Sequence, residues 1–417
     1  MALPVPCDWL EVPAGHPFGL QTLPYGSFSS PHHPARRCVG VRIGDQVLDL
    51  SSAVERLLPG RTDNFAAGNL DAFLAEGDSA WSQVRADLTT WLSREHYRSA
   101  IEDLLLPADG VTMHLPFTVA DYADFYTSEQ HAINVSKIFR PDAAEPLAPN
   151  WHHLPAGYHG RSGTVVVSGT PIRRPCGQFK PAVSDKPVFG HSRRLDFEAE
   201  IGFVVGTESV TGERVPAARF EEHVFGVCLV NDWSARDIQG WETVPLGPFL
   251  GKSFGTTISP WIVPLAAFSH ARVRPPSLDR ELLPYLAEAG DWGLDIDLQV
   301  SVNGHVVTRP PYRTQFWSPA QMLAHLTVNG ASLRTGDLFA SGTVSGPSRD
   351  QYGSLIELSW GGKSPVELGD GSRRSWLEDG DEVVITGTAT GPEGTRIGLG
   401  DAHGQVMPAW EPEPGLP

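Results

Sequence analysis

The sequence predicts a mainly β protein of the α+β class, organised in about two domains. Three observations favour this fold class. The chain of 417 residues is long enough to bury a large core. Glycine and proline are both frequent, with 43 and 36 residues, which favours a turn-rich β chain over a helix bundle. Several segments also alternate apolar and polar residues with the period of a β-strand.

Residues 1–116 form the first predicted domain. Apolar residues alternate over 39–43 before a Gly-Asp turn, which predicts a β-hairpin. Apolar residues recur at helical spacing over 81–92, and Ser79 is expected as the N-cap of that helix. His32-His33 is expected in a surface loop, because no second metal-ligand cluster accompanies it. This domain is therefore predicted to pack against the second one and to carry no chemistry.

The second predicted domain spans residues 117–417 and begins where tyrosine and polar residues become dense. Alternating apolar residues over 294–302 run into Asn303-Gly304, a strong signal for a two-residue hairpin. Ser318-Pro319 predicts the start of a capped amphipathic helix. Further strands are expected within 336–347, 355–360 and 381–386.

Composition excludes several classes of protein. The net charge is −17 and the pI is near 5.3, and no basic patch stands out, which argues against a nucleic-acid partner. No stretch approaches the ~20 apolar residues of a membrane span, and the first residues lack a signal-peptide pattern. The cysteines are widely spaced, which favours free thiols in a reducing compartment: Cys7, Cys38, Cys176 and Cys228. A soluble, cytoplasmic protein is expected, with no membrane partner.

The alternating segment Leu195–Val205 predicts a strand in which Glu198 and Glu200 project from one face. Two carboxylates about 7 Å apart along a strand repel each other unless a cation or a proton joins them. The apolar run 224–230 leads to Asp232, which places another carboxylate at a strand end. Oxygen-only clusters suit hard cations such as Ca²⁺ or Mg²⁺. The alternative is that Glu198 and Glu200 lie on a solvated strand face.

The segment 124–140 concentrates four kinds of functional side chain in seventeen residues. Asp124, Tyr126, His131 and Arg140 bring a carboxylate, a phenol, an imidazole and a guanidinium. Each one alone has a structural explanation. Their concentration predicts the wall of a site.

Gly251–Gly255 matches the G-x-S-x-G nucleophile elbow, with Ser253 as its serine. The elbow requires a strand before it and a helix after it. Here Pro245 and Pro248 precede the motif, and an extended segment that ends at Pro260 follows it. A serine hydrolase is therefore disfavoured.

Taken together, six stretches resemble the fumarylacetoacetate hydrolase family and span essentially the whole chain. They are Asp124–His131 (DFYTSEQH), Leu154–Arg161 (LPAGYHGR), Leu195–Glu200 (LDFEAE), Asn231–Gln239 (NDWSARDIQ), Pro245–Thr257 (PLGPFLGKSFGTT) and Ala340–Thr343 (ASGT). The resemblance implies an N-terminal SH3-like β-barrel domain followed by a mixed β-roll catalytic domain. It also implies a homodimer that hydrolyses a carbon–carbon bond of fumarylacetoacetate in tyrosine and phenylalanine catabolism.

The resemblance also implies roles for individual residues. The ligands of a Ca²⁺ or Mg²⁺ ion would be Asp124, Glu198, Glu200 and Asp232, and a second ion would lie near Asp232, Lys252 and Thr256. His131 matches the general base and Glu357 the carboxylate that orients it. The groups that stabilise negative charge would be Arg236, Gln239 and Lys252. Substrate contacts would come from Tyr126, Arg140, Tyr158, Gln239, Thr243 and Thr343.

One position departs from the family pattern. Thr243 stands where the family has a second tyrosine against the substrate, a departure that concerns the affinity or the preferred acyl group more than the chemistry. The sequence is also compatible with two other functions. One is a related acylpyruvate hydrolase, or an oxo-acid decarboxylase or hydratase of the same superfamily. The other is a non-catalytic binding or scaffold protein, against which the intact set of carboxylates, His131 and Lys252 argues.

Overall fold

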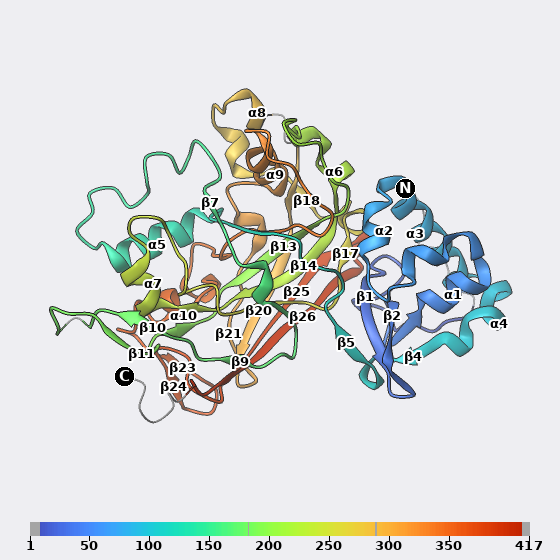
Figure 1. Cartoon of the computed structure of the whole chain (residues 1–417), viewed down its shortest axis with the longest axis horizontal. Helices are drawn as coiled ribbons and strands as arrows, with labels where there is room; N and C mark the ends of the chain where they lie inside the picture. Colours follow the sequence, from blue (N-terminus) through green and yellow to red (C-terminus); the bar gives the residue numbers. More distant parts are fainter. Residues whose placement is uncertain (1–8, 182, 288–289, 411–417) are drawn as a thin grey trace.

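Two parts, each built on a β-sheet, lie side by side in the computed structural model (Figure 1), which describes residues 9–181, 183–287 and 290–410. The smaller part is N-terminal, and the larger part carries two sheets with short helices around them. The mainly β, α+β fold class is thus confirmed. The division of the chain at residue 116 stays a prediction.

The N-terminal part is built on a small antiparallel sheet with the strand order β4-β3-β2-β1-β5. Its strands are β1 (Tyr25–Ser30), β2 (His33–Ile43), β3 (Gln46–Asp49), β4 (Leu105–Pro107) and β5 (Thr112–His114). Its helices are α1 (Leu50–Leu57), α2 (Asp71–Ala75), α3 (Asp78–Ser93) and α4 (Arg98–Ile101). The β2–β3 hairpin confirms the one predicted after residue 43. His32 lies in an exposed turn and His33 begins β2, also exposed.

The predicted N-cap of α3 is wrong by two residues. The cap is Gly77, and Ser79 lies inside the first helical turn. Gly77 has a φ of +86°, a conformation that glycine adopts without the steric cost of a side chain. The chain therefore enters the helix at this glycine.

The larger part is organised around a mixed sheet with the order β7-β6-β22-β13-β14-β16-β8, and β17 pairs with β14. The neighbours β6 and β22 are parallel, as are β16 and β8. The strands are β6 (Tyr122–Phe125), β7 (Gly157–His159), β8 (Val165–Val167), β13 (Ala199–Val205), β14 (Val224–Asp232), β16 (Thr256–Ile258), β17 (Val263–Pro264) and β22 (Leu338–Ala340).

A second sheet of this part has the order β21-β20-β25-β26-β9. Its strands are β9 (Ile172–Arg173), β20 (Ile296–Val302), β21 (His305–Thr308), β25 (Glu382–Thr390) and β26 (Arg396–Met407). The predicted hairpin at Asn303-Gly304 is confirmed between β20 and β21, and both residues have positive φ. The predicted strand over 381–386 is the first half of β25.

The first sheet is buried on both faces. Ile201, Phe203 and Leu229 pack into one core with Leu298 and Ile385 of the second sheet. On the opposite face, Val204, Phe225 and Val230 belong to a core shared with the N-terminal part. The ring of Phe225 meets the rings of Tyr25, Phe73 and Trp81 edge-on. Side chains on either face of β13 and β14 are therefore shielded from water.

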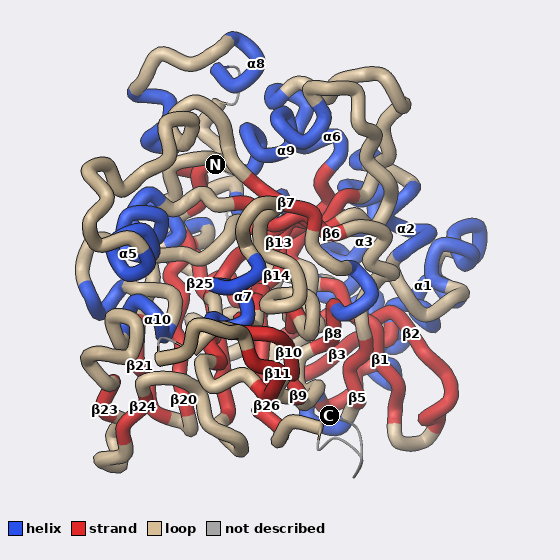
Figure 2. The backbone as a smooth tube through the Cα atoms, turned by 60° about the vertical axis from the view of Figure 1, so that its left-hand side comes forward, coloured by secondary structure: helices blue, strands red, loops and turns tan. Residues whose placement is uncertain are grey.

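Short helices and strand pairs complete the larger part. The helices are α5 (Glu129–Phe139), α6 (Phe220–His223), α7 (Arg236–Glu242), α8 (Pro284–Ala287), α9 (Pro319–Thr327) and α10 (Leu355–Leu358). The strand pairs are β10 (Cys176–Phe179) with β11 (Val188–His191), β12 (Leu195–Asp196) with β15 (Ser234–Ala235), β18 (Arg272–Val273) with β19 (Gly293–Leu294), and β23 (Val366–Glu367) with β24 (Arg373–Arg374). Helix α9 has the predicted Ser318 cap, completed by Gln321 as a capping box. Helices α5, α7 and α10 lie near one another on one side of the sheets (Figure 2).

Two predicted strands differ in the structure. The segment 195–205 is divided into β12 and β13, and the break falls at Phe197-Glu198. The segment 355–360 is not a strand but begins with the helical turn α10. The side chain of Asp196 accepts hydrogen bonds from the backbone N–H groups of Leu355 and Ile356, which favours the helical turn.

None of the helices in the described ranges is long and apolar enough to cross a membrane. Cys38, Cys176 and Cys228 are free thiols. Cys7 lies outside the described residues.

Candidate active site

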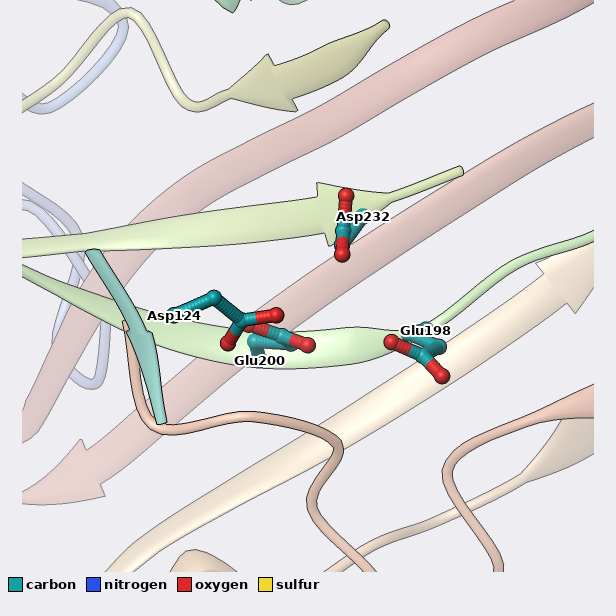
Figure 3. Close-up of side chains that lie close together, drawn as sticks. All are labelled: Asp124, Glu198, Glu200 and Asp232. Carbon is teal, nitrogen blue, oxygen red and sulfur yellow. The ribbon is translucent and has the colours of Figure 1, made fainter. Parts of the chain in front are cut away.

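Four carboxylates meet where neighbouring strands of the first sheet end. Asp124 lies on β6, Glu200 on β13, Asp232 at the end of β14, and Glu198 directly before β13. Each residue is at most 4% exposed. One oxygen atom from each lies within 4.8 Å of the others, and Figure 3 shows the carboxylates turned toward a common centre. The alternative of a solvated strand face is therefore wrong.

The chemistry of this cluster fits a hard cation. Within the described residues, Oδ1 of Asp124 and both carboxylate oxygens of Glu200 are buried without a hydrogen-bond partner. Buried carboxylate oxygens without a partner cost free energy of folding unless a proton or a metal ion binds them. Burial, followed by the charges of the neighbouring carboxylates, raises the pKa of Glu200 well above its usual range. The oxygen-only donor set is the type that Ca²⁺ and Mg²⁺ prefer.

Two buried cations border the cluster. Nζ of Lys252 donates to Glu198 and also to Oδ2 of Asp232, at 2.9 Å. Arg236 donates through Nη2 to Oε1 of Glu198 at 2.6 Å. Burial alone would raise the pKa of Glu198, but Arg236 and Lys252 hold this pKa well below its ordinary value. Glu198 therefore stays ionised, whereas burial raises the pKa of Asp124 and Glu200.

His131 and Glu357 form a buried pair beside the cluster. Nδ1 of His131 lies 2.6 Å from Oε2 of Glu357, and Nε2 lies 3.9 Å from Oε1 of Glu198. Helix α5 carries His131 in its first turn, behind the Ser128 cap. Since Nδ1 faces a carboxylate, the structure favours the tautomer with its proton on Nδ1 and the free lone pair on Nε2.

Three side-chain donors besides His131 hold the carboxylate of Glu357. Asn134 donates at 2.8 Å to Oε1, and Ser345 and Ser354 donate to Oε2 at 2.9 and 2.7 Å. Burial would raise the pKa of Glu357, but His131, Ser354 and Asn134 keep it below the ordinary value. The carboxylate is thus kept as an acceptor for the imidazole N–H.

A cavity of about 590 Å³ lies between α5 and α7. Four residues that the sequence assigned to the substrate line it: Tyr126, Arg140, Gln239 and Thr243. Arg140 is exposed at the rim, and the ring of Tyr126 meets that of His131 edge-on at 5.4 Å. The hydroxyl group of Thr243 donates to the backbone oxygen of Gln239 at 2.6 Å, so it is already engaged.

A smaller cavity of about 90 Å³ lies beside the carboxylate cluster. Its lining includes Tyr158, Asp232, Lys252, Ser253 and Thr256. The hydroxyl group of Tyr158 donates to Asp232 at 3.3 Å, and that of Thr256 donates to the same carboxylate at 3.2 Å. Ser253 lies in a turn between the described helix α7 and strand β16, so the strand–turn–helix context of a nucleophile elbow is not met.

Thr343 is 2% exposed, and its hydroxyl group has no hydrogen-bond partner within the described residues. The structure thus brings together the predicted cation ligands, His131, Glu357, Arg236, Gln239 and Lys252. The roles that the sequence assigned to them stay predictions.

Four residues that hydrogen-bond to Arg236 or Glu357 were not predicted from the sequence. They are Asp196, Asn134, Ser345 and Ser354. Asp196 lies in the same short stretch as Glu198 and Glu200, so a third carboxylate there was a usable signal. Nothing in the sequence near Asn134 or the two serines indicates that they meet Glu357.

The fold and the site together define a β-rich enzyme with a buried acidic centre that can hold a divalent cation. Two family models match the chain: "Fumarylacetoacetate (FAA) hydrolase C-terminal" over residues 121–406 and "Fumarylacetoacetase N-terminal" over residues 21–116. The chain therefore belongs to the fumarylacetoacetate hydrolase family.

Full-length relatives agree with this assignment. The chain is 46% identical to human fumarylacetoacetase, covering 97% of this chain and 100% of the relative. The identity is 43% with the protein of Dictyostelium discoideum, covering 96% and 98%, and 42% with that of Arabidopsis thaliana, also covering 96% and 98%. A fumarylacetoacetate hydrolase structure from Exiguobacterium antarcticum matches with a TM-score of 0.54 at 17% identity, covering 93% of this chain and 99% of that one. This last likeness concerns the fold alone.

Proposed function

We propose that the chain hydrolyses fumarylacetoacetate to fumarate and acetoacetate, the last step of tyrosine and phenylalanine catabolism. The observation that carries this proposal is the His131–Glu357 pair beside the four buried carboxylates. The similarity to fumarylacetoacetases along nearly the full length of both chains favours this substrate over an acylpyruvate or a simple oxo acid.

The proposed cation is Ca²⁺ or Mg²⁺, held by Asp124, Glu198, Glu200 and Asp232. When bound, it supplies Lewis acidity toward the oxygens of the diketone. A second ion is proposed beside Asp232, Lys252 and Thr256. Lys252 already neutralises charge at that position, so the second ion is expected to bind more weakly.

His131 is the proposed general base. Its Nε2 atom accepts a proton from water while Glu357 holds the ring through Nδ1. The water oxygen then forms a bond to the carbonyl carbon of the fumaryl group. The adjacent carbon–carbon bond breaks, and its electron pair leaves with the acetoacetate carbon. That carbon takes up a proton, which balances the reaction as addition of one water.

Arg236, Lys252 and Gln239 are the proposed donors to the negative charge that develops on the departing acetoacetate. In a dry site each such donor is typically worth about 3 kcal/mol. Gln239 accepts from Nη1 of Arg236 through Oε1 at 3.0 Å, which leaves its amide N–H groups for the substrate. Because Arg236 and Lys252 are both less than 8% exposed, their charges are poorly screened by water.

The substrate is proposed to occupy the cavity of about 590 Å³ between α5 and α7. Tyr126, Arg140 and Thr243 line this cavity, and Arg140 offers a guanidinium to a carboxylate of the substrate. Thr343 is proposed as a further contact, since its hydroxyl group is buried without a partner within the described residues. Tyr158 is proposed as another contact, and it lines the smaller cavity beside the carboxylate cluster. A homodimer and a cytoplasmic location belong to the same proposal.

A substrate panel tests the proposed function. Purified protein is offered fumarylacetoacetate, acetylpyruvate and oxaloacetate at matched concentrations, and products are identified by NMR. We expect fumarate and acetoacetate in equal amounts, and a kcat/KM for fumarylacetoacetate that exceeds the others by at least ~10²-fold. A higher kcat/KM for acetylpyruvate or for oxaloacetate decarboxylation would overturn the proposal in favour of a different reaction of the superfamily.

A further inference from the structure

Asp196 is a fully buried carboxylate next to the site. It ends β12, which pairs with β15 directly before α7. Its Oδ1 accepts from the backbone N–H groups of Phe197 and Leu355 at 2.8 and 2.7 Å. Its Oδ2 accepts from Ile356 N at 3.0 Å and from Nε of Arg236 at 2.8 Å. Both oxygens are therefore saturated with donors.

These four hydrogen bonds join two separate parts of the proposed machinery. Through Arg236, Asp196 fixes the guanidinium that bonds Glu198. Through the N–H groups of Leu355 and Ile356, it fixes the first turn of α10, and the next residue is Glu357. Asp196 is thus bonded both to a proposed charge-stabilising group and to the backbone beside the proposed orienter.

The contacts close into a ring of buried groups. Arg236 bonds Glu198 at 2.6 Å, and Nε2 of His131 lies 3.9 Å from the same Glu198 oxygen. His131 bonds Glu357 at 2.6 Å, and the backbone of α10 leads from Glu357 back to Asp196. A displacement of Asp196 would move the guanidinium and the His131–Glu357 pair relative to each other.

We propose that Asp196 is a positioning residue, which sets the distance between the Arg236 guanidinium and the His131–Glu357 pair. It touches neither the substrate cavity nor the reacting atoms, and it acts through Arg236 and α10. This inference rests on the proposed function, because it gives Asp196 a role in that reaction. An error of about 1 Å in such a geometry typically costs ~10²-fold in rate.

An Asp196→Asn variant tests this role, because it replaces one acceptor oxygen of Asp196 by an NH₂ group. Asparagine has one amide oxygen and one amide nitrogen, so its nitrogen must take the place of either Oδ1 or Oδ2. In the first case the NH₂ group faces Leu355 N, and in the second it faces Arg236 and Ile356 N. Either way at least one of the two backbone hydrogen bonds that hold α10 is lost, and in the second case the bond from Arg236 is lost as well, while the size and burial of the side chain are unchanged.

The experiment measures kcat, KM and the imidazole N–H proton resonances of the full-length protein. For Asp196→Asn we expect kcat to fall by ~10–100-fold with KM within ~3-fold. We also expect the strongly deshielded His131 Nδ1–H resonance to shift or broaden, since α10 carries its partner. The Asp196→Glu variant keeps the negative charge and both acceptor oxygens. It replaces Asp196→Asn in the experiment if the asparagine variant does not fold. It too should lose kcat, because one extra methylene displaces both ends.

Asp381 offers a matched control. It is 3% exposed, and it bonds Nε of Arg374 at 2.8 Å and the backbone N–H of Glu378 at 2.7 Å. None of these partners bonds a residue of the site. Asp381→Asn should lower Tm while leaving kcat and the His131 resonance unchanged.

Three outcomes test the positioning role of Asp196 and the proposed function. Wild-type kcat in a folded Asp196→Asn or Asp196→Glu variant would overturn the inference. Equal losses of kcat in the Asp196→Asn and Asp381→Asn variants would also overturn it, because they would indicate a merely structural role. If the wild-type protein does not cleave fumarylacetoacetate, the proposed function fails. In that case the NMR measurement still decides whether Asp196 holds the His131–Glu357 pair.

Discussion

Oε2 of Glu357 lies 2.6 Å from Nδ1 of His131, although the two residues are 226 positions apart in the chain. The carboxylate is buried on α10 and the imidazole is buried on α5. Asn134, Ser345 and Ser354 donate to the same carboxylate, and these hydrogen bonds stabilise the ionised form of Glu357. This relationship turns Nδ1 of His131 toward Glu357 and Nε2 toward Glu198.

Replacing Glu357 by glutamine is expected to lower kcat by ~10²-fold with little change in KM, because a neutral amide oxygen orients the imidazole less strongly than the carboxylate does. The glutamine NH₂ group would also face buried donors, at a cost of about 1–3 kcal/mol in stability. Steady-state kinetics and thermal melts measure both effects. The control is Glu382→Gln, which changes a glutamate that lies 2.9 Å from His403 outside the site. A Glu357→Gln enzyme with the full rate would refute the orienting role.

The cation-free protein should become less stable as the pH rises. Burial and the neighbouring carboxylates raise the pKa of Glu200 in the folded state, so the folded chain binds this proton more tightly than the unfolded chain does. The stability linked to this proton is fully present below the ordinary glutamate pKa, and it is lost as the pH rises toward the raised folded-state pKa. The Glu200→Gln variant lacks this titration. The Tm of Glu200→Gln minus that of the wild type, both in chelator, should therefore grow from acid to neutral pH.

The converse measurement adds Ca²⁺ or Mg²⁺ at neutral pH. We expect the wild-type Tm to rise with ion concentration, since an ion that binds only the folded state stabilises it. Glu200→Gln should respond much less, because it loses a carboxylate with two unpartnered oxygens. A Tm difference in chelator that stays constant with pH, or equal responses to the ion, would contradict the assignment of Glu200.

Thr243→Val is expected to leave kcat and KM within ~3-fold of the wild type, since a hydroxyl group already bonded to its own helix contributes little to the substrate. That hydroxyl group donates to the backbone oxygen of Gln239. Thr243→Tyr introduces a phenol at the wall of the cavity and should change KM more than kcat. If Thr243→Val raised KM by more than ~10-fold, the threonine would itself be a substrate contact.

Ser253→Ala is expected to keep kcat within ~3-fold, because catalysis by a serine nucleophile would require the elbow geometry that is missing here. A serine-directed phosphonate should likewise leave the rate unchanged. The comparison variant is His131→Ala, which removes the proposed base. Inactivation by the phosphonate, with loss of the effect in Ser253→Ala, would move the nucleophile to this serine.

Much of the fold could be predicted because local patterns agree with it. Asn303-Gly304 sits in positive φ and closes a hairpin, and Ser318 caps α9, as their chemistry requires. The apolar run around Ile356 was assigned to the wrong element because it is too short to show a period. Its helical turn is favoured by Asp196, which lies 159 positions before Leu355. Such long-range contacts are not visible in a local window.

Three members of the acidic cluster could be predicted, because Glu198 and Glu200 belong to a segment with strand alternation and Asp232 follows an apolar run. The complete burial of the cluster could not be predicted from alternation alone. Glu200 projects from a face of β13 that also packs, through Val204, against the N-terminal part. Shielding of that face depends on contacts such as those between Phe225 and Trp81. The site therefore depends on how the two parts pack.

Hydrolysis of fumarylacetoacetate is expected to depend on a divalent cation held by the four carboxylates. The most direct test follows the loss of diketone absorbance before chelation, after chelation, and after Ca²⁺ or Mg²⁺ is restored. We expect the rate to fall by at least ~10²-fold in chelator and to recover with the ion, and Glu200→Gln to recover poorly. Full turnover in a chelated protein from which the ion has been shown to be absent would mean that the reaction needs no cation at the four carboxylates.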